Sequence, residues 1–276
     1  MTYKIAADSS SNLLSFDGVD FSVVPLKIIT AKKEYVDNAE LDVSAMVRDL
    51  HEYSGKSGSS CPNVADWLEA FGDADRVFAL TITSKLSGSY GTALQAKSQY
   101  ELEHPDRKVY VLDTFSTGAT MVFAAEKIRD MLGAGCDFDE ICETVHEYVY
   151  DHTSLMFLLK SMRNLANNGR VSPAVAKLAG VLGIHVLGVA KEGQISMLSK
   201  CRNQNSGFQK ILSEMAERGY NGGKVSISHT DNPAGSETLA KMIHEKYLDA
   251  SIDIIENRAL CSFYAELGGI IIGFEK

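Results

Sequence analysis

The sequence predicts an α/β protein in two parts: an N-terminal, mostly parallel sheet covered by helices (residues 1–152) and a C-terminal α+β domain (residues 153–276). Up to about residue 150, short apolar strands alternate with helical patterns, and a polar turn joins each strand to the next helix. This alternation is typical of a parallel sheet. A hairpin pattern at residues 184–199 then interrupts it and indicates an α+β arrangement.

The composition is that of an ordinary globular protein, with 45% hydrophobic residues and a net charge of -9 over 276 residues. An acidic chain argues against nucleic acid or an anionic membrane as the main partner. Five cysteines without a Cys-x-x-Cys pair indicate reduced thiols. Neither a charged-then-apolar leader nor an apolar run of bilayer length is present, so we expect a soluble, cytoplasmic protein without stable membrane insertion.

The chain opens with a short predicted strand, residues 3–7, that ends in Asp8-Ser9-Ser10-Ser11-Asn12-Leu13. A strand followed by such a polar turn is typical of the ligand-facing edge of an open α/β sheet. Residues 21–29 are rich in β-forming side chains, and Pro25 within them indicates an edge strand or a bulge. We therefore expect the sheet to begin with these two strands.

Two predicted helices then flank a polar loop. Apolar residues at helical spacing predict a helix over residues 41–53, and residues 54–60 are read as a flexible loop. The next helix is predicted to start at Pro62, a favoured first helical residue, and to bury Trp67 in the core. Ser59 and Ser60 thus precede a helix.

Residues 76–96 predict a buried strand, a hydroxyl-rich turn at residues 83–90 and the first turns of a helix. The start of a helix offers free N–H groups and a partial positive charge, which suit an anion. We therefore expect this turn, together with the serines before the preceding helix, to hold the head group of a small ligand. The alternative is that its serines only cap the helix, namely Ser84, Ser87 and Ser89.

The N-terminal half closes with one more strand and two helices. A strand over residues 108–112 leads through Ser116-Thr117-Gly118 into a helix that buries Met121 and Ile128. Asp137 then opens a second helix with an acidic relative of the capping box.

The C-terminal half is predicted to contain a hairpin and two further strand–helix units. The predicted strands are residues 154–160, 184–190, 194–199, 224–229, 251–256 and 269–274. The predicted helices are residues 163–166, a helix from Pro173 to Gly183, residues 205–218 and residues 233–247.

Known catalytic motifs are missing from the sequence. It contains neither a Gly-x-Ser-x-Gly elbow nor a Gly-x4-Gly-Lys-Ser/Thr phosphate loop. His229-Thr230-Asp231 ends a predicted strand, but a turn cap is the better interpretation. His146 and His152 differ too much in helical phase to share a metal and have no third ligand. We therefore predict no catalytic residue, no metal and no cofactor.

Basic residues gather around the predicted hairpin and the turn before it: Arg170, Lys191, Lys200 and Arg202. They are either a solvated hairpin end or a cationic patch that steers an acidic or phosphate-bearing partner.

Short motifs in a shared order and spacing make nearly the whole chain resemble the DegV family, which includes the fatty-acid-binding subunits of bacterial fatty acid kinase. These motifs are Asp8-Ser9-Ser10-Ser11-Asn12-Leu13, Val24-Pro25-Leu26-Lys27-Ile28, Ser59-Ser60-Cys61-Pro62, Thr83-Ser84-Lys85-Leu86-Ser87-Gly88-Ser89-Tyr90, Asn168-Gly169-Arg170-Val171-Ser172 and Lys200-Cys201-Arg202.

The resemblance implies a protein that buries one long-chain fatty acid between its domains and presents the carboxylate to a separate kinase subunit. It implies that Ser59 and Ser87 bind the carboxylate, with Ser60, the Gly88 backbone and Tyr264 nearby. Tyr264 stands where the family usually has a histidine. Two further positions, Arg170 and Arg202, resemble the family's docking sites for the kinase subunit.

Two other functions stay open at this point. A serine-dependent hydrolase would use Ser87 or Ser84 as its nucleophile, although no base is visible in the sequence. A binding module for a polar metabolite would need a pocket lined by polar residues beyond the head-group site. We expect a lipid carrier rather than an enzyme.

Overall fold

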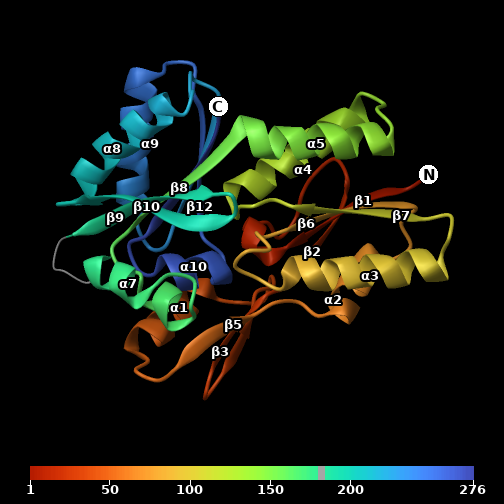
Figure 1. Ribbon diagram of the computed structural model, residues 1–276, viewed down its shortest axis with the longest axis horizontal. Helices are drawn as coiled ribbons and strands as arrows, with labels where there is room; N and C mark the ends of the chain where they lie inside the picture. The colour runs from red at the N-terminus through yellow and green to blue at the C-terminus, as the bar shows by residue number, and fades with distance from the viewer. Residues whose placement is uncertain (180–183) are drawn as a thin grey trace.

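A computed structural model describes residues 1–179 and 184–276, and Figure 1 shows two main sheets side by side with helices packed around them. The N-terminal sheet has the order β2-β1-β6-β7, and every neighbouring pair is parallel. Its strands are β1 (Tyr3–Asp8), β2 (Asp20–Val24), β6 (Arg76–Thr81) and β7 (Lys108–Asp113). The predicted parallel N-terminal sheet is confirmed.

Helices cover both faces of this sheet (Figure 1). The helices α2 (Val64–Phe71) and α3 (Ser89–Glu103) cover one face, and α4 (Ala119–Gly133) and α5 (Phe138–His152) cover the other. Trp67 belongs to the first layer and is fully buried, as predicted. Burying a large apolar side chain stabilises the fold by roughly 1.5–3 kcal/mol, so these two layers hold the sheet in place.

Three predictions for this part of the chain are wrong in part, two of them because of a small antiparallel sheet. It contains β3 (Lys27–Thr30), β4 (Glu34–Val36) and β5 (Ser57–Ser60), and α1 (Val43–Glu52) packs nearby. The β-rich stretch at residues 21–29 is therefore two strands in different sheets, separated at Pro25, which has no N–H to donate. The predicted loop at residues 54–60 is in part β5. The helix predicted from Pro62 begins at Val64, because Asn63 and Asp66 form a capping box.

The C-terminal sheet is mixed and has the order β10-β9-β8-β13-β11-β12, with only the β11–β12 pair parallel. Its strands are β8 (Thr153–Leu159), β9 (His185–Lys191), β10 (Gln194–Cys201), β11 (Lys224–His229), β12 (Ser251–Glu256) and β13 (Ile270–Glu275). The predicted hairpin and α+β arrangement are confirmed. The domain boundary at residues 152 and 153 stays a prediction.

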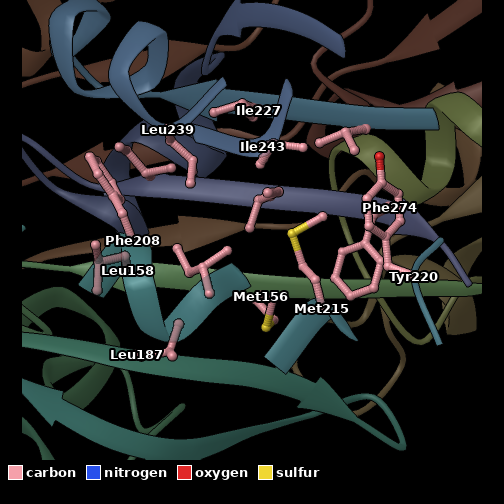
Figure 2. Packing of buried hydrophobic residues seen from close by; sticks show 14 of the residues in the cluster. Met156, Leu158, Leu187, Phe208, Met215, Tyr220, Ile227, Leu239, Ile243 and Phe274 are labelled. Carbon is pink, nitrogen blue, oxygen red and sulfur yellow. The ribbon is translucent and has the colours of Figure 1, made fainter. Parts of the chain in front are cut away.

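The helices α8 (Gln204–Glu217) and α9 (Pro233–Lys246) cover one face of this sheet. Figure 2 shows Phe208 of α8 beside Leu158 of β8, and Leu239 of α9 near Ile227 of β11. Shorter helices lie elsewhere in this half: α6 (Arg163–Asn167), α7 (Pro173–Ala179) and α10 (Ala259–Ala265). The sequence analysis missed α10, and the predicted helix end at Gly183 lies outside the described residues.

The helix α4 bridges the two sheets. Its Phe123 and Ala119 belong to the hydrophobic cluster on the second face of the C-terminal sheet. A Cβ on Gly273 of β13 would lie 2.4 Å from the Ala119 Cβ, so glycine allows this close approach. In the described part of the chain, each helix is too short or too polar to cross a membrane.

Candidate functional site

A buried carboxylate organises the polar end of the site. Asp8 ends β1, and its Oδ2 accepts hydrogen bonds from the Ile82 N–H at 2.8 Å and from the Ser89 Oγ at 2.6 Å. Its Oδ1 accepts from the Ser10 N–H and hydroxyl. Burial raises the pKa of Asp8, while these donors oppose the rise. Asp8 thus fixes the end of β6 and the start of α3 relative to β1.

A cavity of about 410 Å³ lies beside this polar end, and all five predicted ligand-binding residues line it. They are Ser59, Ser60, Ser87, Gly88 and Tyr264. The volume lies within the usual range of small-molecule sites, roughly 300–1,000 Å³. The rest of the lining is largely apolar and includes Leu155, Phe157 and Leu159 of β8.

Ser59 of the first serine motif and Tyr264 of α10 lie close together. The Ser59 Oγ and the Tyr264 hydroxyl are 2.7 Å apart and share a hydrogen bond. Ser59 is held by strand pairing opposite Ile28, and Tyr264 lies on α10. Burial raises the pKa of Tyr264, while the hydrogen bond and the nearby Arg170 lower it. The Tyr264 phenol is therefore neutral at physiological pH.

The second serine motif forms a tight turn at the start of α3. The Ser87 Oγ accepts a hydrogen bond from the Ser89 N–H at 3.2 Å, and Gly88 is the N-cap without any side-chain cap. In the alternative, these serines only cap the helix. That alternative accounts for one local contact, the one that Ser87 makes with the Ser89 N–H. A Cβ on Gly88 would lie 3.0 Å from the Cys61 Sγ, so the two serine motifs meet here. The predicted convergence occurs, although Ser59 lies on a strand and not directly before a helix.

Two contacts close the cavity between the halves of the chain. The Thr83 hydroxyl donates to the Gly193 carbonyl at 2.9 Å, and the Arg170 Nε donates to the Leu86 carbonyl at 3.3 Å. Gly193 has a φ of 78° in the turn of the β9–β10 hairpin. These contacts place the hairpin turn and the loop after α6 over the serine-rich turn.

We expect Gly193→Ala to lower the free energy of unfolding more than Gly219→Ala does. Both glycines have a left-handed backbone, which costs a non-glycine residue about 1 kcal/mol. A Cβ on Gly193 would also lie 2.4 Å from the Thr83 Oγ1, whereas a Cβ on Gly219 would meet nothing within 4 Å. Overpacking adds about 1–3 kcal/mol. Urea unfolding measures both variants, and equal losses would show that the hairpin does not press on Thr83.

The two predicted docking residues lie in different places. Arg170 lines the cavity, and its guanidinium carbon is 5.7 Å from the centre of the Tyr264 ring. Arg202 is exposed and does not line the cavity. Arg170 therefore supplies positive charge beside the predicted head-group residues, a position that the sequence motif alone did not reveal.

Sequence reasoning also missed the apolar wall. In β8, Leu155, Phe157 and Leu159 face the cavity, whereas Met156 and Leu158 face the opposite core. Alternate side chains of a strand point to opposite faces, so a period of two residues could have separated the cavity-facing side chains from the core-facing ones. It could not be assigned because every one of these residues is apolar.

A largely apolar cavity that several hydroxyl groups also line suits an amphipathic small molecule, so the fold and the cavity have the features of a small-molecule-binding α/β protein. The family model described as "Uncharacterised protein, DegV family" matches residues 2–276. The chain belongs to the DegV family, as its motifs predicted.

Relatives of known sequence and structure span the whole chain. A DegV domain-containing protein of Streptococcus pneumoniae is 36% identical over 280 residues, covering 100% of this chain and 99% of the relative. A DegV family protein from Eubacterium eligens, solved loaded with heptadecanoic acid, is 39% identical with a TM-score of 0.97, and both chains are covered completely. The Streptococcus pneumoniae Fatty Acid Kinase (Fak) B3 protein, loaded with linoleic acid, is 35% identical with a TM-score of 0.96, covering 100% and 99%. The prediction of a binding protein rather than an enzyme agrees with these relatives.

Proposed function

We propose that this protein binds one long-chain fatty acid in the 410 Å³ cavity, with the carboxylate at Ser59 and Ser87 and the acyl chain along the apolar wall. The observation that carries the proposal is that hydroxyl groups from both serine motifs, Tyr264 and the apolar face of β8 line one cavity. The relatives loaded with heptadecanoic acid and linoleic acid support it.

The physical chemistry of the cavity fits this ligand. A carboxylate that leaves water needs several hydrogen-bond donors to offset its desolvation. The hydroxyls of Ser59, Ser87 and Tyr264 are such donors, and the Arg170 guanidinium adds positive charge on the same side. Burial of the acyl chain contributes roughly 0.8 kcal/mol per CH₂ and supplies most of the affinity.

The carrier role follows from the same site. We propose that a separate kinase subunit phosphorylates the carboxylate to an acyl phosphate in the cytoplasm, and that Arg170 and Arg202 contribute to docking. The relative that is named as a Fatty Acid Kinase B3 protein supports this part. Arg202 is exposed and can contact a partner, whereas Arg170 reaches the head-group end of the cavity.

The experiment that tests ligand class is lipid extraction from the purified protein followed by mass spectrometry. We expect a fatty acid in near-equimolar amount. Protein that is folded, carries no lipid and does not take up added oleic acid would contradict the proposal.

The kinase step is tested by adding the kinase subunit and ATP to the loaded protein and measuring acyl phosphate. We expect Arg202→Ala to slow the reaction.

Titration of the site gives a further prediction. Because burial raises the pKa of Tyr264, its phenol stays protonated, and we expect fatty-acid affinity to be constant between about pH 6 and about pH 8. In Tyr264→His the imidazole gains a proton as the pH falls through about 6.5, so binding of the anion should tighten toward acid. Fluorescence displacement at several pH values measures both proteins. A wild-type affinity that itself changes across this range would contradict the assigned role.

The serine-hydrolase alternative lacks support in the cavity. Among the described residues that line it there is no His, Asp or Glu that could serve as a base for Ser87. We therefore expect no turnover of esters by the protein alone.

A further inference from the structure

A second cavity, of about 210 Å³, lies on another side of α10 from the acyl cavity. Leu260, Cys261 and Tyr264 of α10 line the acyl cavity, whereas Ser262 lines the second one. The second cavity lies at the carboxyl ends of β11 and β12, the one parallel pair described in the C-terminal sheet, and α1 forms its other wall. Ligands of α/β sheets commonly bind beyond the carboxyl ends of parallel strands.

His229 presents an unused hydrogen-bond donor to this cavity. It ends β11, is only 4% exposed and lines the cavity. Its Nδ1 accepts a hydrogen bond from the Asn232 N–H at 3.3 Å, so the hydrogen of the neutral ring is on Nε2. Burial lowers the pKa of His229 despite the nearby Glu256 and Asp231, which keeps the ring neutral. Within the described residues, no hydrogen bond of Nε2 to another protein group is found, so this donor is free to meet a ligand in the cavity.

Charged groups of both signs surround this donor. Asp231, Glu256 and Glu52 bring carboxylates to the cavity, and Arg48 brings a guanidinium. In the described parts of the chain these four side chains make neither hydrogen bonds nor ion pairs with one another or with other residues. Asp231 also has a φ of 50° in the turn after β11, a conformation that non-glycine residues adopt rarely and that recurs at binding sites.

The polar groups beneath these charges are already satisfied. The Asn257 Nδ2 donates to the Thr230 Oγ1 at 3.1 Å, and the Thr230 N–H donates to the Gly269 carbonyl at 3.0 Å. The floor of the cavity is therefore fixed by its own hydrogen bonds. The groups left for a ligand are the His229 Nε2, the side chains of Ser44 and His51 on α1, and the charged side chains at the rim.

We propose that this second cavity binds a small zwitterion of the size and chemistry of a free α-amino acid. The ligand's carboxylate accepts from the His229 Nε2–H and pairs with Arg48, and its ammonium group pairs with Asp231 and Glu256. A simple anion would meet three carboxylates at the rim. A simple cation would leave the His229 donor unpaired. The proposal is independent of the fatty-acid function, because it concerns a different cavity.

Ligand-observed NMR by saturation transfer tests this proposal on the full protein loaded with oleic acid, so that the acyl cavity is filled. The twenty protein amino acids are added one at a time, with ethylamine and propionate as probes that carry only one of the two charges. We expect at least one amino acid to bind, and neither ethylamine nor propionate to bind comparably. Absence of binding by every amino acid, or equal binding of a singly charged probe, would overturn the proposal.

Two variants locate the binding. Asp231→Asn removes the charge and keeps a side chain that tolerates the left-handed backbone, so the protein is expected to fold. It should lower the affinity for the amino acid about tenfold or more. The control is His244→Gln, an exposed histidine on α9 away from the cavity, which should leave binding unchanged. Unchanged binding in Asp231→Asn, or equal losses in both variants, would refute the assignment to this cavity.

Discussion

Replacing Ser59 and Ser87 together by alanine is expected to weaken fatty-acid binding about a hundredfold or more. Each hydroxyl donates to a buried carboxylate in the proposed complex, and a hydrogen bond to a charged group contributes about 1.5–3 kcal/mol. The apolar wall is untouched, so the variant should still accept a fatty alcohol of the same length. Isothermal titration calorimetry with oleic acid and oleyl alcohol measures both effects.

The matched control for this variant is Ser84→Ala. Ser84 belongs to the same serine-rich turn, but it does not line the cavity. We expect its affinity for oleic acid to remain within about twofold of wild type, since no contact with the ligand is lost. If the double variant bound oleic acid as tightly as Ser84→Ala does, the carboxylate could not lie between Ser59 and Ser87.

Asp8→Ala is expected to have the largest effect on stability, a loss of about 3–5 kcal/mol in the free energy of unfolding. The substitution leaves three donors without their acceptor: the N–H of Ser10, the N–H of Ile82 and the hydroxyl of Ser89. The hydroxyl of Ser10 keeps only the Met121 sulfur, a weak acceptor. Each unsatisfied buried donor costs about 1–3 kcal/mol, partly offset by relaxation and by the lost cost of burying the carboxylate. Urea unfolding followed by circular dichroism measures the loss.

Asp17→Ala is the control for Asp8→Ala, because Asp17 is an exposed aspartate between β1 and β2. Its substitution should change the free energy of unfolding by less than about 0.5 kcal/mol. Comparable stability of the two variants would mean that Asp8 does not organise the polar end of the site.

Periodicity and turn chemistry predicted much of the fold, because most elements are long enough to show a pattern. The strand–turn–helix units around β6 and β7 are examples, and both strands pair in parallel as expected. The start of α2 shows the limit at element boundaries. Pro62 is a good first helical residue, yet the helix begins later, where Asn63 and Asp66 satisfy each other's backbone N–H groups.

The missed elements lack a local signal. Residues Ser57–Ser60 have a loop-like composition and become β5 because β3 offers backbone partners, with Ser59 opposite Ile28. Tertiary pairing therefore overrides the low strand propensity of glycine and serine. The seven-residue α10 has no side-chain cap and buries nearly all of its residues, so neither capping nor one-sided periodicity could reveal it.

The site was predictable as a set of residues but not as a geometry. The family motifs pointed to Ser59, Ser87 and Tyr264, and the structure places all three on one cavity. Their proximity depends on pairing between segments about 200 residues apart, as in the Ser59–Tyr264 contact. The position of Arg170, on the cavity and near the Tyr264 ring, also required the fold.

The most direct measurement of the central proposal is a crystal structure of this protein loaded with oleic acid. We expect the carboxylate within hydrogen-bond distance of the Ser59 and Ser87 hydroxyls, near Tyr264 and Arg170, and the acyl chain against Leu155, Phe157 and Leu159. A carboxylate at the opposite end of the cavity, or a fatty acid bound outside it, would contradict the proposal.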